Sequence, residues 1–535
     1  MLLDSHDLPP SGTLEADVCI VGGGAAGIAL ALGLQDSSLS VVVVEGGGRT
    51  ATDANRGTYC AVPGRGARCT LGVEPSKGWF LGGNTNTWAG NCRPLDEPDY
   101  EARPWMPNSG WPIGSDELRP YYERAQSVLG LGDLRWYDPE ECRPHLEHPP
   151  LDVDPSLLTT RMVHICPVLS LAERHGETLE TGRDLQVLLR AEAVRLAADP
   201  GTDRVAALEI FGAGGRRCRL VAGTFVLCAG GIENARILLD SADVRPEGLG
   251  NEHDLVGRHF MEHWWVDIPL GSWHESDVAL YQFDPRGPQR VDDTAVWAQL
   301  ALSPELMRRE QLPGISVWFA SRRPATASIV AAKMLALSAR GRVPPDPITD
   351  LRLIGTDAVD APRHLLRRLP RNRRTLADGY SLLVQVEQVS HPENRVQLSE
   401  RLDAADRHLP ELSVRLTPEE RRAHERGLEV VATELGLNTA RLVQQMRLMF
   451  DGRRCGFFWH HMGTTRIDDD PTRGVVDRNC RVHGVSNLFV LGSAVFPSGG
   501  TGPPTLSIVA LALRLAEHLV GRPARASQPP EVEMP

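Results

Sequence analysis

The sequence predicts an α/β fold in two parts, and three features of the chain support this. A short apolar run at residues 16–21 leads directly into the glycine-rich segment 22–27, which is the order of strand, tight turn and helix. A second apolar run at 41–44 ends in Glu45. Apolar residues alternate over 380–386, which is typical of a strand half-buried in an antiparallel sheet. We therefore expect a Rossmann-like domain with parallel strands and a second lobe built on an antiparallel sheet with covering helices.

The first turn has the pattern of a dinucleotide-binding site. Gly22, Gly24 and Gly27 let the backbone approach a pyrophosphate. The helix that starts near Ala25 presents unpaired N–H groups and a positive dipole end to the same group. Glu45 follows the glycines by about twenty residues, where such folds place the acid that binds a ribose hydroxyl. The alternative is a glycine-rich turn with a purely structural role.

Length and charge narrow the classes of function. The chain has 535 residues, a formal net charge of -12 and a pI near 5.8. This length exceeds one ordinary core, and the acidity argues against nucleic acid as a partner and suits a neutral or cationic small substrate. Residues 1–10 contain no apolar run, and no window has the roughly twenty apolar residues of a membrane span, so we expect a cytoplasmic protein. The ten cysteines form no Cys-x-x-Cys pair, so we expect mostly buried thiols and no metal site.

The nucleotide-binding part is expected to be discontinuous, because residues 226–231 resemble another buried strand that ends in small residues before a helix. The expected division is 12–95, 180–262 and 455–523 for the nucleotide-binding domain, 96–179 for a connecting and lid region, 263–454 for a substrate lobe, and 524–535 for a disordered tail.

Two segments of the expected substrate lobe have distinctive patterns. Residues 328–340 have the pattern of an amphipathic helix. Six arginines between Arg363 and Arg374 form either a solvated face or a docking surface for an acidic partner or a membrane surface.

Six blocks of this chain recur in order in one known family. They are the 22–27 loop with Glu45; 81–88; 111–113 through 120–122; 229–233; 394–396; and the C-terminal segments 459–466 and 487–505. Together they resemble the glucose–methanol–choline (GMC) family of FAD-dependent oxidoreductases. Trp88 is most similar to the branch that includes pyranose oxidases and related bacterial sugar and alcohol dehydrogenases.

The resemblance implies FAD as the cofactor. The residues that it assigns to FAD are Gly22, Gly24, Ala26, Gly27, Glu45, Gly82, Gly83, Asn84, Trp88, Val194, Ala229, Gly492, Ser493, Pro504 and Thr505. Of these, Val194 would meet the adenine through its backbone. Some members of the branch attach FAD through a histidine just before the tryptophan, and this chain has Thr87 there. We therefore expect FAD to be bound non-covalently.

The resemblance also implies the catalytic residues. His460 is the first residue of the family's His-x-x-Gly-Thr pattern and would be the base, a task that suits imidazole. His461 and Trp459 are assigned to the substrate, and His263 to the supporting wall of the site.

One position departs from the family pattern. Members usually carry asparagine or histidine where this chain has Pro503, which offers no side-chain donor and no backbone N–H. Thr501 or His461 would then substitute, or His460 would act alone.

The function implied is oxidation of an alcohol to a carbonyl on a polyol, sugar, amino sugar or hydroxylated secondary metabolite, with hydride transfer to flavin N5. Molecular oxygen or an external carrier would accept the electrons, and the sequence is compatible with a homo-oligomer. Pro503 keeps a second enzyme hypothesis open, namely flavin-dependent desaturation or a redox-neutral lyase reaction. A third hypothesis is a non-catalytic protein that binds flavin or a partner. Five tryptophans (Trp264, Trp265, Trp297, Trp318 and Trp459) fit either a stacking surface for a ring or the core.

Overall fold

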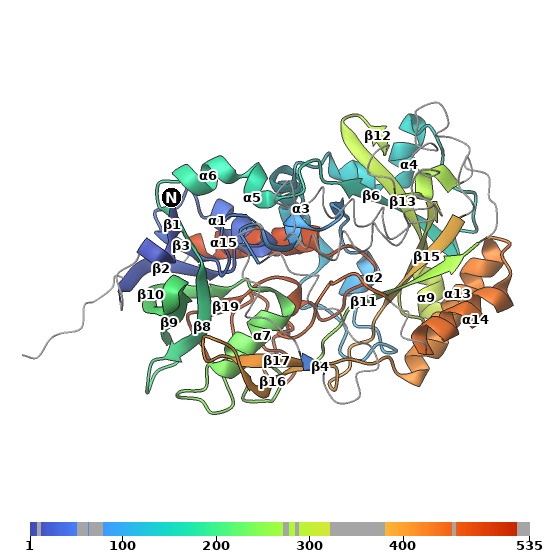
Figure 1. Ribbon diagram of the computed structural model, residues 1–535. Coiled ribbons are helices and arrows are strands. Elements are labelled where there is room, and N and C mark those ends of the chain that lie inside the picture. The colour runs from blue at the N-terminus through green and yellow to red at the C-terminus, as the bar shows by residue number, and fades with distance from the viewer. Residues whose placement is uncertain are drawn as a thin grey trace, which may run out of the picture.

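The computed structural model (Figure 1) describes residues 1–7, 12–50, 62–63, 79–270, 278–283, 288–321, 380–451 and 456–521. The expected helix at 328–340, the arginine cluster at 363–374 and the tail at 524–535 lie outside these ranges. Two large sheets dominate the described part, one on the left and one on the right of Figure 1. The α/β architecture with a discontinuous Rossmann-like domain and an antiparallel second lobe is confirmed.

The first sheet takes its strands from both ends of the chain. In spatial order these are β1 (Leu2–Asp4), β7 (Leu185–Leu189), β3 (Val41–Val44), β2 (Thr13–Val21), β10 (Arg216–Leu227), β9 (Val205–Gly212) and β8 (Ala191–Ala198), with β19 (Leu488–Val490) also paired to β10. The strands from β1 to β10, and β19, pair in parallel, whereas β9 and β8 continue the sheet in antiparallel fashion. All four residues of β3 are buried, as expected of a parallel strand covered on both faces.

Two helices from opposite ends of the chain pack together against this sheet. They are α1 (Ala25–Gly33) and α15 (Thr505–Val520), and α3 (Ser115–Leu129) also packs on α15. A Cβ placed on Gly33 would lie only 2.7 Å from the Cβ of Ala516, so glycine permits the close approach of α1 and α15.

The second sheet is antiparallel. Its order is β18 (Gly456–Phe457), β11 (His263–Pro269), β15 (Tyr380–Glu387), β14 (Ile315–Ser321), β13 (Thr294–Leu302), β6 (Leu158–Ile165) and β5 (Asn91–Cys92), with β12 (Gln289–Val291) beside β13. Thus β6 comes from the expected connecting region, and β5 and β18 from segments expected in the nucleotide-binding domain. On its right in Figure 1 lie α13 (Pro418–Glu434) and α14 (Thr439–Asp451).

The two faces of the second sheet differ in chemistry. Alternate residues of β15, such as Leu382 and Val384, belong to the apolar face, and Ile315 of β14 on that face meets Gly427 of α13. The other face carries Gln385 and polar residues of the neighbouring strands. The expectation that this strand is half-buried is wrong, because its polar face is also covered: Gln385 is buried and donates to the Thr501 carbonyl.

Smaller elements join the two lobes. A three-stranded sheet contains β16 (Arg395–Leu402), β17 (His408–Ser413) and β4 (Val62–Pro63). The remaining α-helices among the described residues are α2 (Glu97–Tyr100), α4 (Pro139–Cys142), α5 (Leu171–Arg174), α6 (Gly176–Thr181), α7 (Gly230–Asp240) and α9 (Pro304–Glu310). The start of α13 is fixed by a capping box between Thr417 and Glu420, with Pro418 at its first position.

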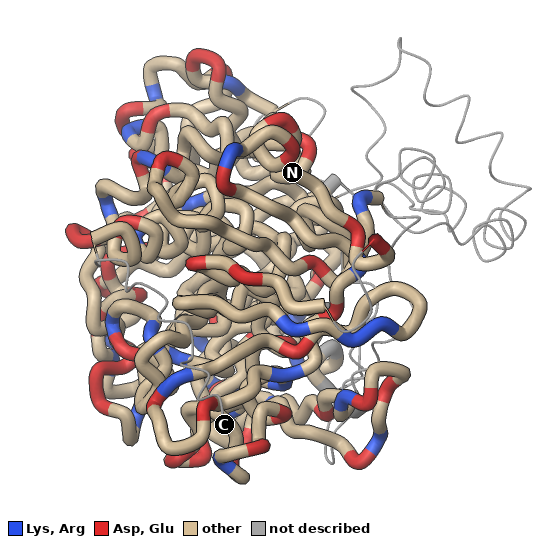
Figure 2. Tube along the Cα trace, turned by 90° about the vertical axis from the view of Figure 1, so that its left-hand side faces the viewer, with Lys and Arg blue, Asp and Glu red and all other residues tan. Residues whose placement is uncertain are grey.

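Acidic and basic residues are interspersed over the face that Figure 2 presents. Within the described ranges, no helix is both long and apolar enough to span a bilayer. The seven described cysteines are free and buried, as expected; they are Cys19, Cys92, Cys142, Cys166, Cys218, Cys228 and Cys480.

Candidate active site

Four parallel strands of the first sheet end in one row. Val21 of β2 lies beside Val44 of β3 and Leu227 of β10, and Leu227 lies beside Val490 of β19. The residues that follow these strands therefore gather along one edge. Ligands of open α/β sheets bind at this carboxyl edge of the strands.

The glycine loop leaves open space at this edge. Gly24 is the N-cap of α1 and has no side-chain cap, and the nearest atom to a Cβ placed on it is the Cα of Gly83, at 4.0 Å. The Gly82 N–H donates to the Gly23 carbonyl over 2.8 Å, which brings the 3-10 turn η4 (Gly83–Asn86) beside the loop. Gly27, in contrast, packs tightly, because a Cβ there would overlap the Gly22 carbonyl oxygen.

Glu45 is held at the end of β3 by backbone donors. Its Oε2 accepts the Gly23 N–H over 2.9 Å, and its Oε1 accepts the Gly47 N–H over 2.8 Å. Burial raises the pKa of this carboxyl, and the two N–H groups oppose that effect. The carboxyl group is thereby fixed next to the glycine loop.

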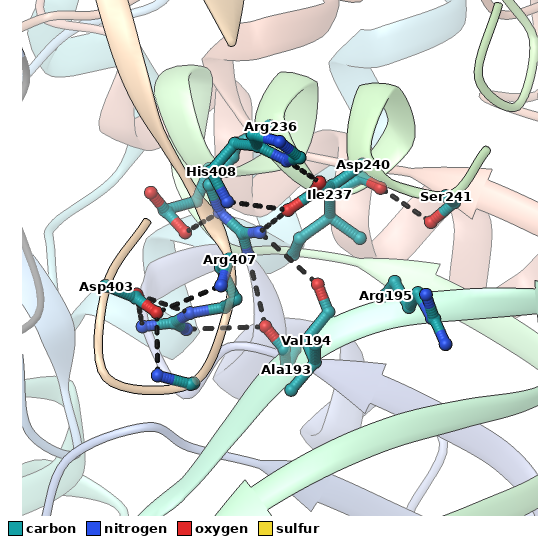
Figure 3. A network of polar contacts seen from close by, with 12 residues as sticks. Ala193, Val194, Arg195, Arg236, Ile237, Asp240, Ser241, Asp403, Arg407 and His408 are labelled. Atoms are coloured by element: carbon teal, nitrogen blue, oxygen red, sulfur yellow. Dashed lines mark hydrogen bonds and ion pairs between the residues drawn. The ribbon is translucent and has the colours of Figure 1, made fainter. Parts of the chain in front are cut away.

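Val194 lies at an irregularity of the sheet, where the pairing of β8 with β9 shifts between Ala193 and Arg195. Figure 3 shows Arg236 of α7 above this point: its Nη1 donates to the Val194 carbonyl over 3.3 Å and its Nη2 to the Ala193 carbonyl over 3.1 Å. Ion pairs with carboxylates of the same helix, including Asp240 at 3.2 Å, hold Arg236 in place.

Two histidines from distant parts of the chain meet beside the second sheet. The Nδ1 of His460 lies 2.8 Å from the Nδ1 of His263, and the Nε2 of His263 lies 2.9 Å from the Gly500 carbonyl oxygen. A carbonyl only accepts, so His263 donates through Nε2 and, when neutral, carries its lone pair on Nδ1. His460 must then donate through its own Nδ1, which leaves the lone pair of His460 on Nε2.

Both imidazoles are neutral at rest. Burial lowers the pKa of His263 to about 4. Burial and the neighbouring His263 and His461 likewise place the pKa of His460 well below its ordinary value. A neutral imidazole is the form that a base needs before it takes a proton.

Glu262 fixes the backbone of both histidines. Its Oε1 accepts the N–H of His263 over 2.8 Å and the N–H of His460 over 2.7 Å. Its Oε2 lies 3.7 Å from the Nε2 of His461. Burial raises the pKa of Glu262 to about 8, although the two backbone donors oppose this.

A buried ion pair supports the Gly500 peptide. Arg103 binds Glu387 through two contacts of 2.9 and 2.6 Å, and each side chain is 1% exposed. Glu387 also accepts the Gly500 N–H over 3.0 Å. Burial alone would raise the pKa of Glu387, but Arg103 outweighs this and the pKa lies below its ordinary value. Asp99 packs against Gly500, where a Cβ would overlap its carboxylate.

Two family models match this chain. A model described as FAD dependent oxidoreductase matches residues 17–248, and a model described as GMC oxidoreductase matches residues 390–512. This chain has an FAD-dependent oxidoreductase domain and a GMC oxidoreductase C-terminal domain. The matched segments contain the glycine loop, Glu45 and the His460 segment, so FAD is its cofactor.

Several known GMC-type proteins are similar to this chain. It is 25% identical to 6'''-hydroxyparomomycin C oxidase of Streptomyces lividus over 94% of this chain and 92% of that protein. It is 26% identical to the fructose dehydrogenase large subunit of Gluconobacter japonicus over 59% of this chain, which spans about half (51%) of that subunit. The crystal structure of pyridoxine 4-oxidase from Mesorbium loti shares the fold, with a TM-score of 0.57, 17% identity, and coverage of 95% of this chain and 99% of that one.

The GMC cofactor fits the carboxyl edge of the first sheet. Gly230 and Gly492 adopt left-handed backbone with φ of +87° and +102°, and nothing lies within 4 Å of a Cβ placed on either, so they extend the space beside Gly24. The uncapped start of α1 can receive the pyrophosphate, and Glu45 can receive a ribose hydroxyl.

Most residues that the sequence assigned to FAD come together at this edge. They are Gly22, Gly24, Ala26, Gly27, Glu45, Gly82, Gly83, Asn84, Ala229, Gly492 and Ser493. Val194 lies at the shifted pairing of β8, and Pro504 and Thr505 begin α15. The indole N–H of Trp88 donates to the Leu169 carbonyl over 2.9 Å, and the adjacent Thr87 is exposed.

The residues assigned to catalysis and to the substrate differ from one another in burial and in contacts. Thr501 is buried, and its hydroxyl accepts from Arg93 over 3.2 Å. Pro503 is half-buried. The backbone of His461 packs against Gly231 of α7, where a Cβ would lie 2.5 Å from the His461 carbonyl oxygen. Trp459 is 45% exposed and has a left-handed φ of +58°.

Sequence reasoning missed the buried residues that hold the site together. Arg103, Glu262, Glu387 and Arg236 were not singled out. One signal was present: along β15, the residues between the apolar ones are Ser381, Leu383, Gln385 and Glu387, which is a largely polar second face. No pattern pointed to Arg103, which pairs with a residue 284 positions away.

Proposed function

We propose that this enzyme oxidises a carbinol of a ring substrate that carries several hydroxyl or amino groups, with His460 as the base. One observation carries the assignment: the hydrogen bonds from His460 to His263 and from His263 to Gly500 leave the lone pair of His460 on Nε2. In that state His460 can accept the proton of a substrate hydroxyl. Bound FAD supplies the acceptor for the carbinol hydride.

The surroundings of His460 support this role. Glu262 and His263 fix its backbone and ring, so the imidazole needs little reorganisation to act. The ring of Phe458 stacks near it, with centroids 5.8 Å apart and planes inclined by 21°. The ring centroid of Phe458 lies 5.7 Å from that of Trp318, so a row of aromatic side chains extends from the base over the sheet.

Two observations support a polar, polyhydroxylated substrate. The polar face of the second sheet carries Asp267 and Trp265 on the same strand as His263. Among the described residues, the Oδ1 of Asp267 and the hydroxyls of Ser316 and Ser381 on that face are buried without hydrogen-bond partners. Buried polar atoms are normally paired, so these fit partners on a substrate.

The relatives support the same class. Their names state activity on 6'''-hydroxyparomomycin C, on paromamine and on fructose. The net charge of -12 favours a substrate with amino groups over an anionic one. We propose amino sugars and related aminated polyols as the first compounds to test.

Trp459 is proposed to stack on the substrate ring. It directly precedes His460, and its exposed indole is held by a backbone conformation that non-glycine residues rarely adopt. An exposed aromatic ring beside the base offers a flat apolar surface to a sugar.

The domain boundaries expected from the sequence, with 12–95, 180–262 and 455–523 in the FAD-binding domain, are retained as a proposal. The strands of the first sheet support it, because they come from 2–44, 185–227 and 488–490.

An anaerobic reduction experiment tests the proposed function. The purified protein is mixed with amino sugars, neutral sugars, simple alcohols and aromatic alcohols, and bleaching of the oxidised flavin band is followed. The wild type should bleach with an aminated or polyhydroxylated compound, and His460→Ala should retain FAD yet reduce it at least 100-fold more slowly, the usual scale of general base catalysis being about 10²–10⁴. Near-normal reduction by His460→Ala would refute the assignment of the base. Admission of air then separates oxygen from an external carrier as the electron acceptor.

A further inference from the structure

His263 makes more contacts than a residue that only lines the wall of the site would need. It is fully buried, yet both ring nitrogens are engaged, one by the Gly500 carbonyl and the other by the His460 ring. The contact with His460 joins like nitrogens at 2.8 Å, so one of them must carry the hydrogen and the other the lone pair. The Gly500 carbonyl decides which, and it makes His263 the acceptor.

The other candidates for assisting His460 are engaged elsewhere. The Thr501 hydroxyl accepts from Arg93, and the Nε2 of His461 lies 3.7 Å from Glu262. Pro503 has neither a side-chain donor nor a backbone N–H. His263, in contrast, is in direct hydrogen-bond contact with the His460 ring.

We propose that His263 is a positioning residue that sets the tautomer of His460 and takes up the substrate proton through it. When the Nε2 of His460 binds the proton of the substrate hydroxyl, the O–H bond breaks and an Nε2–H bond forms. The hydrogen on the Nδ1 of His460 then passes to the Nδ1 of His263. His460 is neutral again and His263 carries the positive charge, while the two electrons of the carbinol C–H bond leave with the hydride to the FAD of this family. This inference rests on the proposed role of His460 as the base.

The charges around His263 suit a transient cation. The Gly500 N–H donates to Glu387 over 3.0 Å, and the Gly500 carbonyl, which belongs to the next peptide group, accepts from His263 over 2.9 Å, so Gly500 places the carboxylate close enough to favour a charged His263. Glu387 acts in the opposite sense to burial and raises the pKa of His263, whereas Arg93 lowers it.

Two further titratable groups lie near His460. Glu262 faces both histidines through its backbone contacts, and His461 lies on the far side of His460. The acidic groups that face the pair are therefore Glu387, through Gly500, and Glu262, whose pKa burial raises to about 8.

Two substitutions at 263 separate proton uptake from positioning. In His263→Gln, the amide oxygen can still accept from the Nδ1 of His460 but cannot take its proton, whereas His263→Leu removes both functions. His164→Gln is the matched control, because His164 is also fully buried, has a pKa lowered to about 4 by burial, and lies on β6 away from the pair.

The first readout is the rate of anaerobic flavin reduction as a function of pH. We expect flavin reduction in His263→Gln to be about 100-fold slower than in the wild type, which is within the usual range of acid–base contributions. The midpoint of its pH profile should be displaced by at least one pH unit from that of the wild type. His164→Gln should keep the rate and the midpoint of the wild type. A His263→Gln rate within threefold of the wild type with an unchanged midpoint would overturn the proposal.

The second readout does not depend on turnover. Nitrogen-15 NMR spectra of protein labelled in its histidines report which ring nitrogen carries hydrogen. We expect the His460 signal, identified by its loss in His460→Ala, to show hydrogen on Nδ1 in the wild type and in His263→Gln. Hydrogen on the Nε2 of His460 in the wild type would overturn the proposal even if His263→Leu failed to fold. If His460→Ala reduces its flavin normally, the proposed base itself has failed; if only the His263 variants behave normally, His460 stands and this inference falls.

Discussion

Replacement of Glu387 by glutamine should destabilise the protein far more than replacement of a similar surface carboxylate. Glu387 and Arg103 form two contacts with each other, and each side chain is 1% exposed. Removal of one partner of a buried pair leaves an uncompensated charge and costs about 3–5 kcal/mol. Unfolding entropy of about 2.1 cal/mol/K per residue, taken over 535 residues, gives about 1.1 kcal/mol/K, so we expect Tm to fall by about 3–5 °C.

A matched control is available on the surface. Glu310 binds Arg426 through two contacts of 2.7 and 3.1 Å, but these side chains are 25% and 48% exposed. An exposed pair contributes about 0.2–1 kcal/mol, so Glu310→Gln should lower Tm by about 1 °C or less. Calorimetry of the FAD-saturated proteins measures both shifts.

The double variant Arg103→Met with Glu387→Gln tests the cause. It removes the buried cation as well, so it should recover a substantial part of the loss seen in Glu387→Gln alone. Equal shifts for Glu387→Gln and Glu310→Gln would refute the reasoning. The reasoning would also be refuted if adding Arg103→Met to Glu387→Gln lowered the stability further by as much as an independent second substitution would.

Four further predictions follow from other parts of the molecule. Gly24→Val should leave the fold intact, because the nearest atom lies 4.0 Å from a Cβ there, yet weaken FAD binding about 100-fold, measured by fluorescence titration; wild-type affinity would contradict the assigned pyrophosphate site. Burial raises the pKa of Glu420 to about 8, so the native protein holds a proton that the unfolded chain releases above about pH 4.5, and stability should fall as pH rises from about 4.5 to 8. Glu420→Gln should lessen this fall in Tm, and an unchanged slope would show that the carboxyl is already ionised. Trp459→Ala should raise KM with little change in kcat, and equal losses in kcat and kcat/KM would instead place the indole in the transition state. Acid precipitation should release the flavin into the supernatant, because Thr87 offers no imidazole for attachment, and a yellow pellet would contradict non-covalent binding.

The sequence predicted those parts of the fold that depend on contacts between residues close together in the chain. The strand, turn and helix around Gly22–Gly27 use contacts within a few residues, and the spacing to Glu45 is set by one βα unit. The antiparallel lobe was visible in the alternation over 380–386, but the burial of both faces was not. That burial depends on Thr501 and Gly500, which approach the strand from more than a hundred residues away.

In the candidate site, too, the sequence predicted only the features with a local signal. The motif around His460 located the base candidate, but only the fold shows that His263 and Gly500 decide which nitrogen of that histidine carries hydrogen. Nor does the adjacency of His461 to His460 in sequence reveal that His461 packs against Gly231 of α7. The long-range pair of Arg103 with Glu387 leaves no signal in the sequence around Arg103, although Glu387 belongs to the polar alternation along β15.

The pairing of β19 with β10 has a consequence for biosynthesis. The cofactor edge is complete only when Leu488–Val490 lies beside Phe225–Leu227, and α1 meets its partner α15 only when residues 505–520 exist. More than nine-tenths of the chain must therefore leave the ribosome before the nucleotide half of the protein can close. Contacts of such large sequence separation form slowly. Until then, the apolar surfaces of β10 and α1 are exposed, which makes the nascent chain a client for chaperones and makes flavin capture one of the last events of folding.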